Sequence, residues 1–191
     1  FTPVTPYSNV IDFTKGYFMV NEEWFGHTNG SVNFVSNDGK INYRVYSDVN
    51  ENKAFGATTQ YGTIYGDKFY FVSKQPKDGG DTQYTPGGRL VVDDALTMNT
   101  LAEFDNVGGG DGRSFVGVDE KTGYIGASNG IFIFDIANMK VGTLIAGTGG
   151  GSQYAGQIGN MIRTSQYVFA VKQNGGILVI DPKTNTVIKT I

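Results

Sequence analysis

The stretch Gly130-Ile-Phe-Ile-Phe-Asp-Ile136, with the turn Ala137-Asn-Met-Lys140 behind it, sets the architecture, because the 191-residue chain contains four versions of it. In each version a Gly opens an apolar run, and a polar turn leads from this run to the next. The other versions begin at Gly30, Gly88 and Gly176. The recurrence, with an insertion in the first interval, is close to the roughly 40–45 residues of one β-propeller blade.

A second apolar run precedes each of these glycines. The four runs are Tyr17-Phe-Met-Val20, Phe69-Tyr-Phe-Val72, Tyr124-Ile-Gly-Ala127 and Tyr167-Val-Phe-Ala-Val171. A further strand precedes these runs, as in Phe115-Val-Gly-Val118. Positive φ angles for tight hairpin turns are expected from the pairs Asn29-Gly30, Asp38-Gly39, Asn129-Gly130 and Asn174-Gly175. Each unit therefore predicts four antiparallel strands, which is the content of a propeller blade.

The apolar runs do not alternate with polar residues, so both faces of each sheet are expected to be buried between neighbouring blades. The sequence thus predicts an all-β chain, a β-propeller with four four-stranded blades and few or no helices. The blades fall at roughly 1–55, 56–110, 111–152 and 153–191 and form a single domain. Two packed sheets in a sandwich are the alternative, which the regular period disfavours.

Composition narrows the classes of function. The chain has no Cys, which excludes disulfides, Cys-ligated zinc, iron–sulfur clusters and a thiol nucleophile. With one His, a net charge of -3 and no run of Lys or Arg, neither a metal ligand set nor nucleic-acid binding is expected, and we expect no cofactor. No stretch approaches the roughly 20 consecutive apolar residues of a membrane span, and the first residues do not resemble a signal peptide.

Catalysis is not expected, and no catalytic residue is assigned. The Gly-rich segments 108–112 and 147–151 fit no phosphate-binding motif. A Ser/His/Asp triad would need His27 as its base, and no Gly-x-Ser-x-Gly elbow is present. A lactonase-like propeller is the enzyme alternative, but the sequence offers no convergent polar set of the kind that such an enzyme needs.

Aromatic and polar residues in or beside loops are the candidates for ligand binding. A sole Trp beside a sole His, Trp24 and His27 with Phe25 between them, forms the first group, because aromatic rings on a rigid scaffold make good contact surfaces. The alternative role for this group is packing between blades. The second group suits a large polar ligand with an apolar face, and it comprises Gln60, Tyr61, Tyr65, Tyr84, Arg113, Tyr154, Gln157 and Arg163.

The unit Asp111-Gly-Arg-Ser-Phe-Val-Gly-Val-Asp-Glu-Lys-Thr-Gly-Tyr-Ile-Gly-Ala-Ser-Asn-Gly-Ile-Phe-Ile-Phe-Asp135 resembles the YVTN-type propeller repeat. Three segments are similar to surface propellers of gut anaerobes, which include the cobalamin-capturing outer-surface lipoproteins of the BtuG type. These segments are Phe18-Met-Val-Asn-Glu-Glu-Trp-Phe-Gly-His27, Thr59-Gln-Tyr-Gly-Thr-Ile-Tyr-Gly-Asp67 and Gly156-Gln-Ile-Gly-Asn-Met-Ile-Arg163.

The resemblance implies the N-terminal half of a seven- or eight-bladed ring, anchored at the outer membrane on the cell surface. It also implies capture of cobalamin or a related corrinoid for uptake, with an outer-membrane transporter as partner. Glycan or protein binding is the second expectation. The sequence has no Cys for the lipid anchor that such lipoproteins carry at their mature N-terminus.

The edges of the predicted sheets lead to an expectation about assembly. A propeller closes to hide its edges, yet no strand remains at the C-terminal side to complete the first blade. Four blades from a larger ring would leave apolar faces uncovered on the first and last sheets. We therefore expect further blades or a second copy of the chain to cover them, with a closed four-bladed ring as the alternative.

Overall fold

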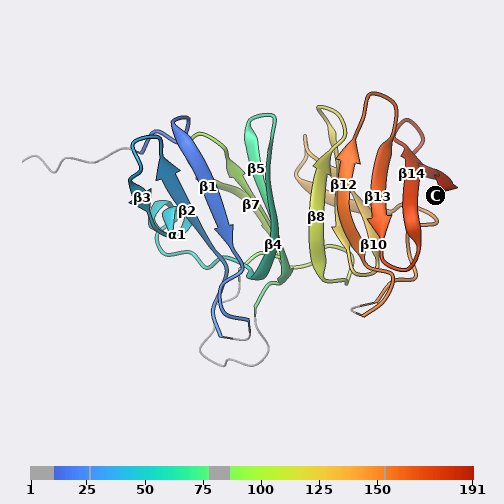
Figure 1. Cartoon of the computed structure of the whole chain (residues 1–191), viewed down its shortest axis with the longest axis horizontal. Helices are drawn as coiled ribbons and strands as arrows, with labels where there is room; N and C mark the ends of the chain where they lie inside the picture. The colour runs from blue at the N-terminus through green and yellow to red at the C-terminus, as the bar shows by residue number, and fades with distance from the viewer. Residues whose placement is uncertain (1–10, 26, 78–86, 153) are drawn as a thin grey trace, which may run out of the picture.

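The computed structural model describes residues 11–25, 27–77, 87–152 and 154–191, and shows four antiparallel sheets side by side (Figure 1). We call them blades 1 to 4. Blade 1 contains β1 (Gly16–Asn21), β2 (Ser31–Ser36) and β3 (Ile41–Asn42), followed by the helix α1 (Val45–Val49). Blade 2 contains β4 (Ala57–Tyr65), β5 (Lys68–Gln75), β6 (Leu90–Asp94) and β7 (Thr100–Phe104).

The C-terminal half of the chain forms the other two sheets. Blade 3 contains β8 (Gly112–Gly117), β9 (Thr122–Ala127), β10 (Gly130–Asp135) and β11 (Lys140–Leu144). Blade 4 contains β12 (Ile158–Arg163), β13 (Val168–Lys172), β14 (Gly176–Asp181) and β15 (Thr186–Thr190). In each of blades 2 to 4 the strands pair in sequence order, as expected for consecutive hairpins.

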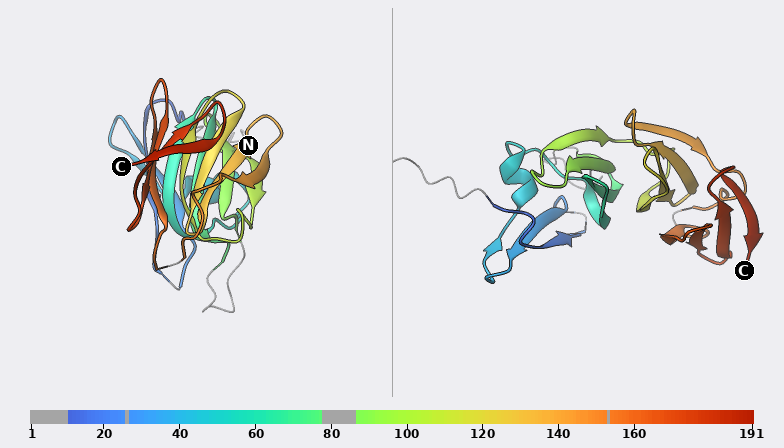
Figure 2. Two further views of the ribbon diagram at one scale, coloured as in Figure 1. Left: turned by 90° about the vertical axis from the view of Figure 1, so that its right-hand side faces the viewer. Right: turned by 90° about the horizontal axis from the view of Figure 1, so that it is seen from above.

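The blades fan out around one side of a common axis and leave the other side open, as the view from above in Figure 2 shows. The first strands of blades 2, 3 and 4, which are β4, β8 and β12, lie on the inner side of this arc, and the last strands lie on its outer rim. The prediction of an all-β propeller that is open rather than closed is confirmed. None of the helices in the described residues is long and apolar enough to cross a membrane.

Blade 1 departs from the predicted four strands, because its sheet has three in the described part of the chain. The strand β2 opens after Gly30 as β6 opens after Gly88, so β1 corresponds to β5, and blade 1 has no described counterpart of the inner strand β4. After β3 the backbone enters a left-handed conformation at Arg44 (φ 54°), which directs the chain into α1. This five-residue helix buries Tyr46 against Phe55, with ring centroids 4.6 Å apart.

Side chains from adjacent sheets form one apolar cluster at each blade contact, which confirms that both faces of the inner blades are buried. Blades 2 and 3 share a cluster in which the rings of Tyr70 and Phe115 stack at 4.0 Å with 8° between their planes. Phe134 approaches both rings edge-on. The segments 90–92 of β6 and 124–127 of β9 therefore consist of hydrophobic residues and Gly, because each face of these strands contacts a different neighbour.

The predicted Asn-Gly and Asp-Gly turns form at three of the four positions. Gly39, Gly130 and Asn174 have positive φ angles, but Gly30 does not. Instead, the Gly30 backbone N–H donates to the Gly56 carbonyl at 2.8 Å, and Asn29 forms an isolated bridge to Ala57. A Cβ at Gly30 would collide with the Thr59 side chain, so this Gly permits the close approach of blades 1 and 2 rather than a turn.

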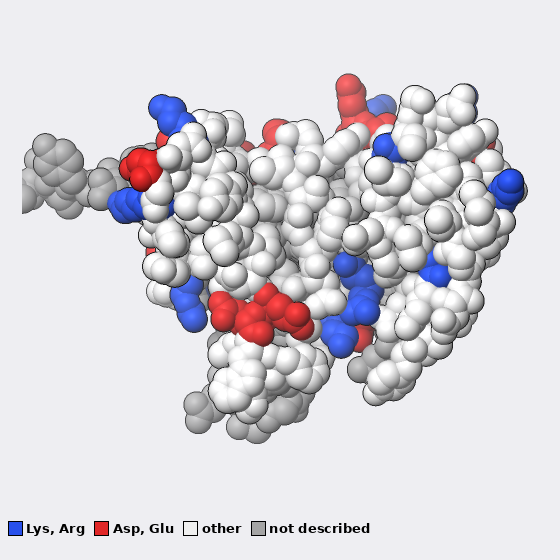
Figure 3. Space-filling view, viewed as in Figure 1, with Lys and Arg blue, Asp and Glu red and all other residues white. Residues whose placement is uncertain are grey.

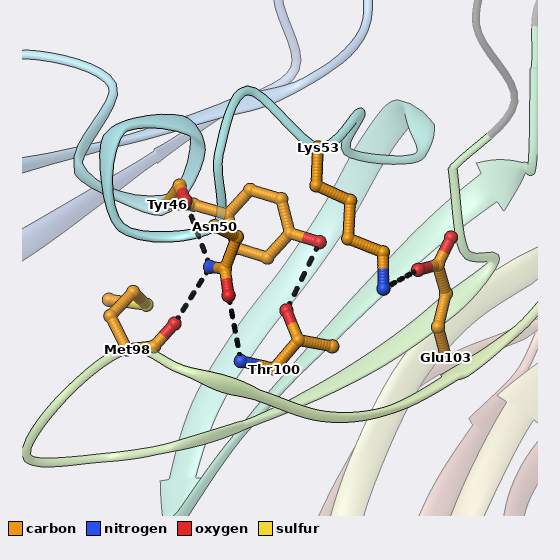
Figure 4. Close-up of polar contacts among 6 residues, drawn as sticks. All are labelled: Tyr46, Asn50, Lys53, Met98, Thr100 and Glu103. Carbon is orange, nitrogen blue, oxygen red and sulfur yellow. Dashed lines mark hydrogen bonds and ion pairs between the residues drawn. The ribbon is translucent and has the colours of Figure 1, made fainter.

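Polar contacts attach α1 to blade 2 (Figure 4). The Asn50 side chain donates to the carbonyls of Tyr46 and Met98, both at 2.9 Å, and accepts from the Thr100 backbone N–H at 2.9 Å. This amide thus satisfies backbone groups of the helix and of the β6–β7 turn at once. The helix therefore belongs to the contact between blades 1 and 2.

Asp93 on β6 is fully buried in the same contact, and neither of its carboxylate oxygens has a hydrogen-bond partner among the described residues. Burial raises the pKa of the Asp93 carboxyl to about 8; Thr100 and Lys53 oppose the rise, whereas Glu103 adds to it. Lys53 is held in an ion pair with Glu103, which Figure 4 shows. The Tyr46 hydroxyl faces the same region, and its pKa is also raised by burial. Asp93 is consequently protonated in the folded protein at neutral pH.

We predict that this carboxyl makes the protein less stable as the pH rises. The folded-state pKa lies above that of the unfolded chain, so the folded state binds the proton more tightly. Its contribution is fully present below pH ~4 and is lost as the pH rises through about 8. The variant Asp93→Asn cannot ionise and should gain on the order of 1–3 kcal/mol relative to wild type between pH 5 and pH 9. Urea unfolding across this range, with the exposed Glu120→Gln as control, measures it; a difference that does not change with pH would contradict the prediction.

Candidate functional site

The end of the arc where β4, β8 and β12 begin carries the largest number of candidate residues. We call it the loop end; it lies at the bottom of Figure 1, with the loops 22–30 and 145–157. The strands are held together here by buried contacts. The Ser114 hydroxyl donates to the Gly159 carbonyl at 2.7 Å and so fixes β8 against β12.

A groove of about 400 Å³ with both polar and apolar walls runs across these strands. Gln60 on β4, Arg113 on β8 and Gln157 before β12 line it, so the structure brings together three residues predicted from the sequence. The Arg113 guanidinium donates to the Gln60 side-chain oxygen at 2.9 Å, which orients both groups. A groove of this size, with few polar groups that converge from separate blades, is within the range of small-molecule sites.

Two polar lining residues were missed in the sequence, Asn160 and Gln173. Asn160 is an exposed polar residue that interrupts the apolar segment 158–162 of the inner strand β12, and this interruption is the signal that was available. Gln173 precedes the Asn174-Gly175 turn and its backbone N–H donates to the Gln157 carbonyl at 2.9 Å. Val171 adds an apolar patch to the same wall.

Exposed aromatic rings lie on the loop end of blade 1. Trp24 is 68% exposed, and its ring lies tilted against that of His27, with 3.9 Å between centroids. Phe25 is also exposed and lies 5.4 Å from the Lys74 ammonium, within cation–π range. The Thr28 hydroxyl accepts from the Trp24 backbone N–H at 3.1 Å. The alternative role of these residues was packing between blades, and their exposed rings do not fit it.

Other predicted residues lie away from the groove. Tyr154 is 81% exposed in the loop before β12. Tyr61 and Tyr65 pack against the cluster between blades 2 and 3, and the Tyr65 ring covers Gly117. Arg163 ends β12 at the opposite end of the strand, where its Nε donates to the Val118 carbonyl at 3.2 Å. Tyr84 lies outside the described residues.

Charges of opposite sign face each other along the lower edge of the view in Figure 3, with an acidic cluster over blades 1 and 2 and a basic cluster over blades 3 and 4. Beside the aromatic loop, His27 also lines a hollow of about 430 Å³ together with Arg44 and Lys53. In the part of the chain that the structure describes, no group of three or more His, Cys, Asp or Glu side chains is placed to hold a metal ion. The loop end offers amide and guanidinium groups in the groove and exposed rings on blade 1.

Four radial antiparallel sheets around an open axis, three of them with four strands in the described residues, define a partial β-propeller. The chain belongs to the family described as domain of unknown function (DUF5074), whose model matches residues 15–191. No curated protein matches the sequence.

Solved structures share this fold at low identity. The computationally designed Ika4 protein matches with a TM-score of 0.52 at 15% identity, over 70% of this chain and 71% of the Ika4 chain. The designed Ika8 protein gives 0.53 at 14% identity, over 83% and 45%. The extracellular domain of the putative hybrid two component system BT3049 from B. thetaiotaomicron gives 0.55 at 13% identity, over 90% and 21%. The chain thus spans less than half of the latter two chains.

Proposed function

We propose that this propeller captures a large polar ligand with an apolar face in the groove at its loop end, and that the ligand is cobalamin or a related corrinoid. The observation that carries the proposal is the convergence of Gln60, Arg113 and Gln157 from three blades on one groove. Amide and guanidinium groups suit the peripheral amides of a corrinoid, and the exposed rings suit its apolar face. The choice of a corrinoid rests on the resemblance to cobalamin-capturing propellers.

A cell-surface location with an outer-membrane anchor, and delivery to an outer-membrane transporter, are part of this proposal. The similar B. thetaiotaomicron structure is described as an extracellular domain, which agrees with a surface role. Surface labelling of cells that express the full-length protein, with and without protease treatment, tests the location. Loss of the label by protease supports it, and complete protection would contradict it.

Glycan binding is the second candidate, and the exposed rings of Trp24 and Tyr154 favour it. Sugar rings stack on such aromatic faces while amide side chains bind their hydroxyls. Neither proposal includes catalysis. A lactone-hydrolysis assay is the direct check of the enzyme alternative. Turnover above the uncatalysed rate would contradict the proposal that the protein binds its ligand and does not convert it.

Titration calorimetry with cyanocobalamin tests the proposed ligand. We expect saturable binding by the 191-residue chain at micromolar concentration or below, and nanomolar binding by the full-length protein. If cyanocobalamin gives no heat and no shift in melting temperature, the corrinoid assignment is wrong, and a panel of oligosaccharides is then tested in the same way. Failure of both ligand classes would contradict the proposed function as a whole.

A further inference from the structure

A hollow of about 510 Å³ lies between blades 2 and 3 at the end opposite the loop end, which is the top of Figure 1. We call it the upper hollow. The turn between β4 and β5 forms its wall on blade 2, and the turns that follow β8 and β10 form its wall on blade 3. Each of these two blades also packs against another sheet on its other face. The volume of the upper hollow is within the range of small-molecule sites.

Tyr70 lines the upper hollow and is fully buried, and its hydroxyl has no hydrogen-bond partner among the described residues. Burial is the main cause that raises the pKa of this hydroxyl to about 12, and the nearby Asp67 and Tyr65 add to the rise. Because Asp67 and Tyr65 also line the upper hollow, the hydroxyl lies close to it. At neutral pH the hydroxyl therefore keeps its proton and can donate a hydrogen bond.

The other blades show that the position of Tyr70 does not require an unpaired hydroxyl. Phe18 in blade 1, Tyr70 in blade 2 and Tyr124 in blade 3 are equivalent, because each pairs with the residue two places before the end of the following strand. The Tyr124 hydroxyl donates to the Asn185 side-chain oxygen in the β14–β15 turn of the next blade. Blade 1 has a ring without a hydroxyl. Tyr70 is thus the member of the set whose hydroxyl is left without a partner in the described structure.

The physical reason is a Met in the turn that faces Tyr70. Asn185 stands four residues after Asp181, and Met139 stands four residues after Asp135 in the equivalent turn of blade 3. Both residues have a left-handed backbone, with φ angles of 54° and 48°. Met139 packs against the cluster that contains Tyr70, but a thioether is a poor acceptor. A buried hydroxyl in these surroundings is destabilising unless another group completes its hydrogen bond.

The remaining walls of the upper hollow favour an organic cation. The Lys68 ammonium is held by the Asp67 carboxylate at 2.6 Å. Glu120 has no ion-pair or hydrogen-bond partner in the described part of the chain, so the lining carries an excess of negative charge. The ring of Tyr65 and the side chain of Ile136 supply apolar contacts. Carboxylates beside aromatic rings are typical surroundings of bound ammonium groups.

We propose that the upper hollow is a second binding site, which takes a small organic cation that also carries a hydroxyl or carbonyl oxygen. Glu120 attracts the cationic group, and the Tyr65 ring contacts it. The Tyr70 hydroxyl donates to the oxygen of the ligand and so gains the partner that Asn185 provides for Tyr124. This site lies at the opposite end of the blades from the groove, so it does not rest on the function proposed for the groove.

Titration of the 191-residue chain with choline and with tetramethylammonium, followed by nuclear magnetic resonance, tests the site. Tetramethylammonium has a similar cationic group but no hydroxyl. We expect both to bind saturably, and choline to bind about 2- to 10-fold more tightly, which is the effect of one neutral hydrogen bond. Tyr70→Phe should bind the two probes equally, and the matched control Tyr124→Phe should keep the preference. The absence of binding by either probe, or a preference that persists in Tyr70→Phe, would overturn the proposal.

Two further variants test the hydrogen bond and the charge separately. Met139→Asn gives Tyr70 a partner inside the protein, and it should remove the preference for choline. Asn adopts a left-handed backbone more readily than Met does, so this variant should melt no lower than wild type. Glu120→Gln should weaken the binding of both probes alike, by about 2- to 5-fold. An unchanged preference in Met139→Asn, or unchanged affinities in Glu120→Gln, would contradict the assigned roles and overturn the site.

Discussion

Replacing Phe115 by Ala is expected to lower the free energy of unfolding by about 3–5 kcal/mol, the typical cost of removing a buried aromatic ring. Phe115 is 1% exposed and carries the contact between blades 2 and 3 through its stack on Tyr70. The cavity would open between two sheets that each have a neighbour on their other side, so little collapse can fill it. Urea unfolding followed by circular dichroism measures the change.

The matched control is Tyr43→Ala, which removes a ring that is 65% exposed and should change stability by less than about 0.5 kcal/mol. A loss below ~1 kcal/mol for Phe115→Ala would mean that the two blades do not pack as described. A separate unfolding step for each half of the chain would contradict the continuous arc.

Replacing Arg113 by Ala is expected to weaken ligand binding by roughly 10- to 150-fold, because a hydrogen bond to a charged group contributes about 1.5–3 kcal/mol. Arg113 is the one cationic side chain among those that line the groove. Its removal also frees Gln60, which accepts its hydrogen bond at 2.9 Å. Calorimetry with the ligand bound by wild type measures the change.

Arg113→Lys keeps the charge but not the fixed fork of donors, and it should recover only part of the affinity. Lys183→Ala, in an exposed turn at the opposite end of blade 4, should bind as wild type does. Equal loss in Arg113→Ala and Lys183→Ala would place the ligand elsewhere.

The fold was predictable because the signals that specify it are local and repeated. A Gly before each apolar run and an Asp after three of them mark the strand ends. The structure shows why: the carboxylates of Asp94, Asp135 and Asp181 accept backbone N–H groups of the turns that follow. The three-stranded sheet that the described residues of blade 1 form, and the short helix α1, were not predictable from the repeat, because this segment departs from it.

The candidate site was less predictable, because its residues converge through the arrangement of blades. Gln60, Arg113 and Gln157 occupy similar places at the start of successive inner strands, and this regularity was the usable signal. In the sequence, Tyr65 and Arg163 are as plausible as the groove residues, but they lie near the far ends of their strands. The position along a strand therefore decides which candidates reach the loop end.

Hydrogen exchange measured with and without saturating cyanocobalamin, or the glycan that binds in its place, tests the site most directly. The groove predicts slower exchange in residues 57–61, 112–114 and 157–160, where the inner strands begin. It also predicts unchanged exchange in the turns 119–122 and 164–167 at the opposite end. Protection confined to those turns, or no protection anywhere at saturation, would contradict ligand capture at the loop end.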